Sequence, residues 1–207
     1  MNSTIYAEKI YTKESGVTKD NVFTDKKVLH IGCGKNKLEG VVGVDLLKLP
    51  GVDVVHDLDN YPWPFANNGF DLVYAHSVVE HITDIVSLFD EIARILKVNG
   101  RLVLAVPYFR SVDAFTDLTH KHFFTSNSLD YFLNTKSSLS AYEYSSVRFK
   151  KVGFWYGWPQ TSRNPFTKIF KFIIHKYPRF YDQYLSLFLP VKIMVWELEV
   201  DKGFNKE

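Results

Sequence analysis

The sequence contains two short apolar segments that lie close together in the chain. Val28-Leu29-His30-Ile31-Gly32-Cys33-Gly34 is typical of a buried strand that ends in a glycine turn, and Val41-Val42-Gly43-Val44-Asp45 of a second strand that ends in a carboxylate. Glycine adopts positive φ and has no Cβ to hold a ligand away from the backbone. A carboxylate at the tip of the neighbouring strand can accept hydrogen bonds from both hydroxyls of a ribose. Together the segments predict a nucleoside-binding crevice at the carboxyl edge of a parallel sheet.

The distance between these segments indicates which nucleoside is bound. Only Lys35 to Gly40 separate them, which is about 9 Å of helix at 1.5 Å per residue. A dinucleotide site requires a full helix there, a third glycine and an acidic residue about 20 positions further on. Asp45 comes too early, and Asn36 or Lys37 occupies the third glycine position. Because no long helix N-terminus is available for a pyrophosphate, the spacing favours S-adenosylmethionine over a nicotinamide cofactor.

The following residues predict an alternation of strands and helices. Asp53–Leu58 and Phe70–Ala75 are expected to form the third and fourth strands, and Arg101–Pro107 the fifth. Between the last two, apolar residues recur at helical spacing from Ile82 to Lys97, and Asn99-Gly100 is expected to end that helix.

These pieces resemble the class I S-adenosylmethionine-dependent methyltransferases across residues 27–107. The segments that carry the resemblance, in the order typical of that family, are His30–Gly34, Asp45, Asp57-Leu58, Phe70–Tyr74, Val79–Ile82 and Arg94–Leu102. The resemblance implies a three-layer, Rossmann-like α/β sandwich with a seven-stranded, mostly parallel sheet whose last strand is antiparallel. In this chain we expect the first helix to be short and a helical insertion to precede the last strand.

The rest of the chain is assigned to an arm and to additions within one domain. Residues 1–24 are polar and are expected to form an N-terminal arm, and 25–207 the methyltransferase domain. Val147–Tyr156 is predicted to be a strand, and Met194–Val200 alternates like an antiparallel edge strand. Between them, 159–190 is expected to form a helical lid or insertion.

The resemblance also implies which residues contact the cofactor. They are Gly32, Cys33, Gly34, Asp45, Leu46, Asp57, Leu58, Ala75 and His76. The glycines and the Ala75-His76 pair would approach the methionine part, and Asp45 would hold the ribose hydroxyls. Asp57 would accept from the adenine amine, with Leu58 presenting its backbone to the ring. The alternatives are that Asp57 is a turn or cap acid and that His76 points to solvent.

Two features depart from the family pattern. His30 stands where the family often has an acid that reaches the cofactor's amino group, and a neutral imidazole supplies no charge there. We therefore expect His30 to be partly structural. The short connection after Gly34 also removes backbone that normally flanks the cofactor.

Asp117-Leu118-Thr119-His120-Lys121-His122 holds the candidate catalytic residues. The segment resembles a Thr-His-x-x-Phe-like stretch of methyltransferases in surface-polysaccharide pathways. His120 is the candidate base, and His122 and Asp117 are candidate orienting or substrate-contacting residues. The alternative is that the histidines only shape the loop. Two histidines and a carboxylate can bind iron or zinc, but methyl transfer needs no metal and we expect none. His81 is expected to brace a helix start, with Glu80 near the cofactor pocket.

Charge is distributed unevenly along the chain. Residues 145–192 contain nine Lys or Arg and one acid, Asp182, a net charge of +8, so the remainder carries −6 of the total of +2. A basic half suits an anionic partner, although a solvated helix face is the simpler explanation. Residues 166–189 are amphipathic and basic, and suit a lid, a surface for oligomer formation or a peripheral membrane contact.

The cysteine content and the absence of apolar runs bear on localisation. Cys33 is the single cysteine, which excludes a disulfide framework and suits a reducing compartment. No uncharged apolar run reaches about 18 residues, and no signal-peptide core is visible in the first 30. We expect a cytoplasmic protein.

The acceptor is predicted from the residues expected around the cleft. Aromatic residues and Arg110 suit O-methylation of a saccharide or another small hydroxylated molecule, including a phosphate- or lipid-linked one. Methylation of nucleic acid is the less favoured alternative, since no RNA-binding appendage is recognised. A non-catalytic S-adenosylmethionine-binding module is the other alternative.

Overall fold

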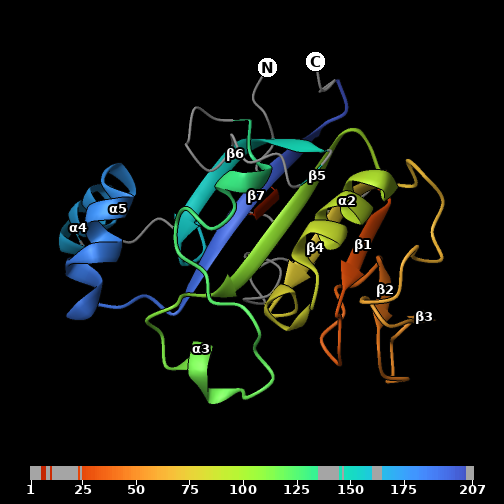
Figure 1. The fold of residues 1–207 in the computed structure, drawn as a ribbon, viewed down its shortest axis with the longest axis horizontal. Helices are drawn as coiled ribbons and strands as arrows, with labels where there is room; N and C mark the ends of the chain where they lie inside the picture. Colours follow the sequence, from red (N-terminus) through yellow and green to blue (C-terminus); the bar gives the residue numbers. More distant parts are fainter. Residues whose placement is uncertain are drawn as a thin grey trace.

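The computed structural model describes residues 6, 7, 10, 23, 25–134, 145, 147–159 and 165–203. These residues form one seven-stranded sheet in the order β3-β2-β1-β4-β5-β7-β6 (Figure 1). The strands are β1 (Val28–Ile31), β2 (Val42–Asp45), β3 (Val54–Val55), β4 (Phe70–His76), β5 (Leu96–Pro107), β6 (Arg148–Tyr156) and β7 (Ile193–Asp201). The helices are η1 (Val79–His81), α2 (Ile85–Ile95), α3 (Asp113–Thr116), η2 (Asp130–Phe132), α4 (Pro165–Lys176), α5 (Pro178–Gln183) and η3 (Leu185–Leu187).

The order of the strands confirms the predicted fold class. β1 pairs in parallel with both β2 and β4, so the chain changes direction across the sheet at β1. In open α/β sheets ligands bind at such a switch point, outside the carboxyl ends of the strands. The arrowheads of β4 and β5 point toward the end of the sheet where the loop that carries α3 lies (Figure 1). That end is therefore where a site is expected.

β7 is antiparallel as predicted, but it is not an edge strand. It lies between β5 and β6 and pairs with both. Its alternating acids do not face solvent: Glu197 is completely buried, and Arg101 pairs with Glu197 at 3.1 Å and with Glu199 at 2.9 Å. The polar residues that alternate along this strand form ion pairs inside the protein. Sequence periodicity cannot distinguish such residues from polar residues on an exposed face.

The predicted short first helix is absent. The residues between β1 and β2 form turns, with positive φ at Gly34 and Gly40. The backbone N–H of Leu38 donates to Nδ1 of His30 at 3.3 Å instead of to a carbonyl one turn earlier. The connection is too short for a helix to form and still return the chain to β2, so a side chain of β1 replaces the helical hydrogen bonds.

The helix that follows β4 is shorter than predicted. Asp84 caps α2 by accepting hydrogen bonds from the backbone N–H of Val86 at 3.0 Å and of Ser87 at 3.1 Å, as expected of an N-terminal aspartate. The helix ends at Ile95, because Leu96 already pairs with Phe70 of β4. The predicted range of 82–97 was therefore too long at both ends.

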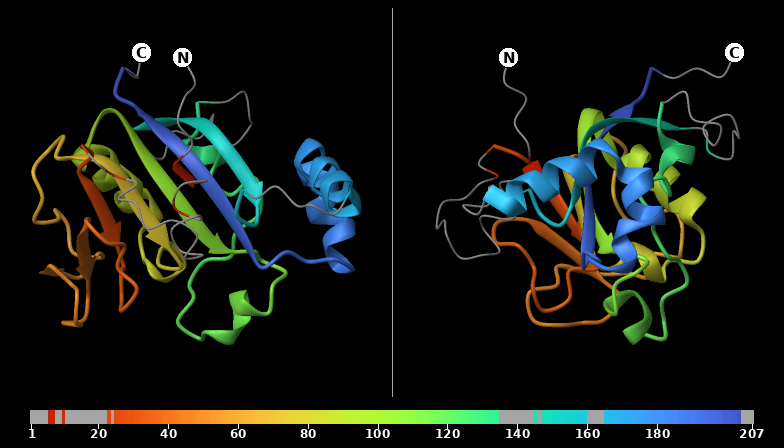
Figure 2. Two further views of the ribbon diagram at one scale, coloured as in Figure 1. Left: turned by 180° about the vertical axis from the view of Figure 1, so that it is seen from behind. Right: turned by 90° about the vertical axis from the view of Figure 1, so that its left-hand side faces the viewer.

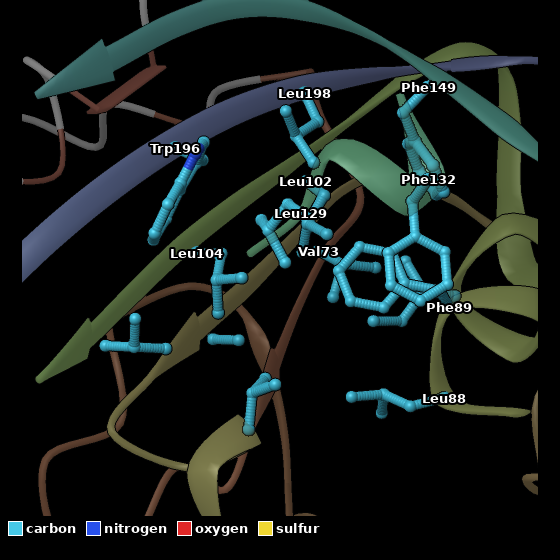
Figure 3. Packing of buried hydrophobic residues seen from close by; sticks show 14 of the residues in the cluster. Val73, Leu88, Phe89, Leu102, Leu104, Leu129, Phe132, Phe149, Trp196 and Leu198 are labelled. Atoms are coloured by element: carbon cyan, nitrogen blue, oxygen red, sulfur yellow. The ribbon is translucent and has the colours of Figure 1, made fainter. Parts of the chain in front are cut away.

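The core lies on both faces of the sheet. On one face, Leu88 and Phe89 of α2 pack over Val73 and Leu102 of the central strands, and Phe89 stacks on Phe132 with ring centroids 4.1 Å apart (Figure 3). On the other face, alternate residues of the same strands pack against Ala7, Ile10 and Phe23. These three residues belong to the predicted N-terminal arm, most of which lies outside the described residues. Alternation along buried strands thus supplies both layers of the core.

The helices between β6 and β7 form the predicted insertion, described from residue 165 onward. α4 and α5 lie at the opposite end of the molecule from β3 (Figures 1 and 2), and Ile174 and Tyr181 join them to the core. Among the described helices none is long and apolar enough to cross a membrane.

The buried carboxylate of Asp182 attaches this insertion to the sheet. It accepts hydrogen bonds from the hydroxyls of Tyr108 at 2.9 Å and Tyr156 at 2.7 Å, and from the backbone N–H and hydroxyl of Ser126 at 3.0 and 2.7 Å. Burial raises the pKa of both tyrosines, so each hydroxyl keeps its proton and remains a donor.

Replacement of Asp182 by asparagine tests this attachment. Asp182→Asn places amide hydrogens against groups that need an acceptor, and is expected to lower the free energy of unfolding by about 2–3 kcal/mol. Urea unfolding followed by tryptophan fluorescence measures the change. The exposed Asp113→Asn is the matched control, with an expected effect below about 0.5 kcal/mol. Equal stability of the two variants would contradict the role of Asp182.

Candidate functional site

The two glycines after β1 have different roles. Both have positive φ, +59° at Gly32 and +51° at Gly34. A Cβ on Gly32 would lie 2.3 Å from Cγ2 of Val78, so this glycine is required by the close approach of the segment that follows β4. A Cβ on Gly34 would have no atom within 4 Å. Gly34 therefore leaves open backbone that a ligand can approach, whereas Gly32 serves packing.

Asp45 closes the glycine turn from the end of β2. Its Oδ2 accepts a hydrogen bond from the backbone N–H of Gly34 at 2.8 Å, and its Oδ1 accepts one from Leu47 at 3.0 Å. A carboxylate has about four acceptor positions, so these bonds fix its orientation and leave positions for a ribose diol. Leu46 at the same tip is 62% exposed. The open Gly34 and the oriented Asp45 fit an adenosyl ligand.

The other residues of the turn face away from this opening. Cys33 is buried, and a Cβ on Gly43 would lie 2.8 Å from its sulfur, so the Cys33 side chain points beneath the loop. Burial raises the pKa of the Cys33 thiol, with a further contribution from the negative charge of Asp45. His30 is buried against Tyr74 and accepts from Leu38, which is the structural role expected of it.

The next acid is held within its own turn. Oδ1 of Asp57 accepts from the backbone N–H of Asp59 at 3.0 Å, and Oδ2 from the side-chain amide of Asn60 at 3.4 Å. Leu58 is buried, and its carbonyl accepts from the indole N–H of Trp63 at 3.1 Å. The turn-acid alternative thus accounts for the contacts of Asp57, and the adenine contact stays a prediction.

Ala75 and His76 end β4 beside the glycine turn. Ala75 is completely buried in the sheet, opposite Ile31 of β1. His76 is partly exposed, and its ring lies edge-on to Trp158 with centroids 5.7 Å apart. Burial raises the pKa of the nearby Glu80 carboxyl, and the charge of His76 is among the contributions that oppose this rise.

Glu80, His81 and His120 converge beside this end of β4. One ligand-type atom of each lies within 4.8 Å of those of the other two, and Nε2 of His120 is 3.9 Å from Oε1 of Glu80. The two histidine rings meet edge-on, with centroids 4.7 Å apart. The backbone carbonyl of Glu80 accepts from the N–H groups of Lys121 at 2.8 Å and His122 at 3.2 Å. These backbone bonds fix the loop after β5 onto η1.

Hydrogen bonds fix both rings of this cluster. Nδ1 of His120 lies 2.8 Å from the carbonyl of Ala114, which can only accept, so this nitrogen carries the hydrogen. The Thr119 hydroxyl donates to Asp117 at 2.7 Å, so its oxygen accepts from Nδ1 of His81 at 2.8 Å. In the neutral form, Nε2 of each ring then keeps its lone pair.

The two remaining candidates support the cluster from outside it. Asp117 is fully exposed and accepts from both the backbone and the hydroxyl of Thr119, which lowers its pKa. Nε2 of His122 lies 2.8 Å from the carbonyl of Ile82 and is occupied by that bond. The structure thus brings His120 together with Glu80 and His81, rather than with His122.

From the sequence, Glu80 was expected only near the cofactor pocket, whereas the structure groups it with His81 and His120. It is 1% exposed, and neither carboxylate oxygen has a hydrogen-bond partner among the described residues. Burial raises its pKa to about 7, opposed in part by the nearby histidines. The pKa of His81 is lowered, first by burial and then by His120. The only sequence signal was the Glu-His pair directly after β4.

The chain is similar to known proteins in sequence and in fold. Residues 36–104 match the sequence profile of a family described as "Methyltransferase domain". Similar solved structures include an S-adenosylmethionine-dependent methyltransferase from Mesorhizobium loti, at 16% identity and a TM-score of 0.51 over 84% of this chain and 90% of that chain. The YcgJ protein from Bacillus subtilis has 15% identity and a TM-score of 0.53 over 95% of this chain and 98% of that one. No curated protein matches the sequence significantly.

The sheet has the strand order 3-2-1-4-5-7-6, with β7 antiparallel. Its similarity to the solved structures establishes that this is the Rossmann-like methyltransferase fold. The match over 36–104, a third of the chain, is to a methyltransferase domain, in agreement with the predicted class I S-adenosylmethionine-dependent methyltransferase. The match favours S-adenosyl-L-methionine as the cofactor. The predicted fold is thereby confirmed and the predicted enzyme class and cofactor agree with the match over 36–104, while the roles of individual residues stay predictions.

Replacement of Asp45 tests the cofactor site. Asp45→Asn removes the negative charge and places an amide N–H₂ where the Gly34 N–H or a ribose hydroxyl needs an acceptor. Loss of about 1.5–3 kcal/mol from hydrogen bonds to a charged group corresponds to roughly 10- to 100-fold weaker binding of S-adenosylmethionine. Calorimetric titration measures it, and Asp113→Asn should bind like the parent. Unchanged affinity in Asp45→Asn would exclude Asp45 as the ribose ligand.

Proposed function

We propose that the protein O-methylates a saccharide or another small hydroxylated acceptor that carries a phosphate group. The observation that most supports this proposal is the cluster of Glu80 and His120 beside the glycine turn, since a hydroxyl nucleophile needs a base. When bound, S-adenosylmethionine supplies the methyl group as a sulfonium. The residues of this chain then have to place the acceptor hydroxyl and hold its proton.

His120 is the proposed base. Its Nδ1–H donates to the carbonyl of Ala114, which directs the lone pair of Nε2 toward Glu80. A proton taken up at Nε2 would be stabilised by the neighbouring carboxylate. Asp117 would act as a positioning residue, because it orients Thr119 and through it His81. His122 would position the loop by its bond to Ile82.

A pocket beside the insertion is the proposed binding site for the phosphate group. It has a volume of about 520 Å³ and is lined by Phe109, Arg110, Thr125, Asn127, Arg179, Asp182 and Gln183. The guanidinium of Arg110 lies over the ring of Phe109 at 5.0 Å, and its Nε has no hydrogen-bond partner among the described residues. Two guanidinium groups in one pocket suit a phosphate, which accepts paired hydrogen bonds from arginine.

Mass spectrometry tests the proposal. Free and phosphate-linked saccharides are incubated with the enzyme and S-adenosylmethionine, and the products are weighed. Products heavier by one CH₂ group are expected from the phosphate-linked acceptors. His120→Ala should lower kcat by about 10²- to 10⁴-fold and leave cofactor affinity unchanged. Arg110→Ala should raise KM for the phosphate-linked acceptor with little change in kcat.

The outcomes separate the alternatives. Full turnover by His120→Ala would remove its role as base. Turnover with nucleic acid instead of saccharides would favour the basic half of the chain as a nucleic-acid surface. Cofactor binding without turnover on any acceptor would indicate a binding module.

A further inference from the structure

We propose that Glu80, His81 and His120 bind a divalent first-row transition-metal ion. The inference rests on the geometry of this cluster and does not depend on the identity of the acceptor. Two imidazoles and one carboxylate form a ligand set used for zinc and for iron(II).

The charge balance of the cluster favours a cation. Nε2 of His81 and of His120 both present lone pairs, and the carboxylate oxygens of Glu80 have no donor among the described residues. The cluster therefore brings three atoms with lone pairs together in a partly buried site. Among the described residues, no hydrogen-bond donor lies between these atoms. A buried carboxylate left uncompensated is costly. A metal ion would serve as the common acceptor of all three electron pairs.

The dimensions of the cluster also suit an ion. Even if all three separations were at their limit of 4.8 Å, the centre of the triangle would lie about 2.8 Å from each atom. Zinc ligands lie about 2.0–2.2 Å from the ion, so small side-chain rotations would complete the site. Glu80 is buried and both histidines are partly exposed, which gives an ion a route of entry.

The surroundings of the rings match those of known metal ligands. A metal-bound histidine usually donates its other ring N–H to a carbonyl or toward a carboxylate. His120 does so to the carbonyl of Ala114, and His81 does so through Thr119 to Asp117. An ion bound at Nε2 of His120 would occupy the atom assigned above as base, so His120 could act as the base only in the metal-free protein. In the metal-bound protein the ion could instead acidify a bound hydroxyl.

Metal binding can be measured without acceptor or cofactor, so its failure is distinguishable from failure of the proposed function. Untagged protein freed of metal by a chelator is titrated with Zn²⁺ by calorimetry and with Co²⁺ by visible absorption. One ion per chain is expected, with a Co²⁺ spectrum typical of nitrogen and oxygen ligands. Mg²⁺, which prefers oxygen ligands, should bind far more weakly.

Variants identify the ligands. Glu80→Gln and His81→Gln should weaken Zn²⁺ binding more than about 100-fold, and Thr119→Val about 10- to 100-fold through the orientation of His81. His56→Gln, a histidine on the turn after β3 that bonds to Asn60, is the matched control and should bind as the parent does. Circular dichroism checks that each variant is folded. Absence of stoichiometric binding, or equal binding by the parent, Glu80→Gln and Thr119→Val, would overturn the proposal.

A second, independent observation concerns the insertion, from which we infer a surface that binds anionic lipid membranes. Phe166, Ile169, Phe172, Phe180, Leu187 and Phe188 are between 51% and 82% exposed. Lys168, Lys176 and Arg179 are exposed on the same helices, whereas the single acid of the insertion, Asp182, is buried in its tyrosine site. Basic helices with exposed aromatic residues bind at the interface of anionic bilayers.

The charge argues against a second copy of the chain as the occupant. A symmetric dimer through this surface would bring the lysines and Arg179 of both copies together without acids to pair them. Phosphate headgroups supply the missing negative charge. The insertion also lies at one end of the molecule (Figure 2), so its exposed side chains can reach a planar surface.

Sedimentation with vesicles tests this surface. The full chain is expected to bind vesicles that contain both phosphatidylcholine and phosphatidylglycerol. It should bind vesicles of phosphatidylcholine alone more weakly, and high salt should release it from the mixed vesicles. Two double variants should each reduce vesicle binding at least about tenfold. One combines Lys168→Glu with Lys176→Glu, and the other combines Phe172→Ser with Phe188→Ser. The matched controls are Lys151→Glu and Val98→Ser, which change exposed residues outside the insertion. Self-association through the insertion without vesicle binding, or no effect of either double variant, would refute the inference.

Discussion

The contact between Gly32 and Val78 holds the two halves of the site together. Because Gly32 lacks a Cβ, the segment after β4 can approach the turn after β1 to a distance that a methyl group would prevent. Two residues beyond Val78 comes Glu80, whose backbone carbonyl fixes the loop that carries His120. The glycine turn and the histidine cluster are therefore positioned relative to each other by one close contact. A side chain at Gly32 would displace η1 and, with it, the candidate base.

The site also shows how one sequence motif can serve two physical purposes. Gly32 and Gly34 are both in the left-handed region, but only Gly34 leaves open space beside its backbone. Asp45 uses two of its acceptor positions to orient itself against that turn. A ligand would meet a carboxylate that is already fixed, so little conformational entropy is lost on binding. The geometry supports the ribose role proposed for Asp45.

Buried carboxylates occur in two contrasting states in this protein. Asp182 is surrounded by four donors and attaches the insertion to the sheet. Glu80 is also buried but has no hydrogen-bond donor among the described residues, and it faces two imidazoles. A buried carboxylate whose oxygens all accept hydrogen bonds is typical of a structural role. A buried carboxylate without such bonds is typical of a functional site. This difference is the physical basis for placing chemistry at Glu80 and architecture at Asp182.

Strand periodicity and turn chemistry are local properties of the chain, so the sheet, the glycine turn and the position of Asp45 could be predicted from the sequence. The sequence also indicated His120 and the helical insertion. It could not place β7 inside the sheet, since the acids that suggested an edge pair with Arg101 from β5. The grouping of Glu80 and His81 with His120, in place of His122, depended on the loop after β5 folding back onto η1. Only the tertiary structure decides such contacts, because they join residues that are distant in sequence and have no shared period.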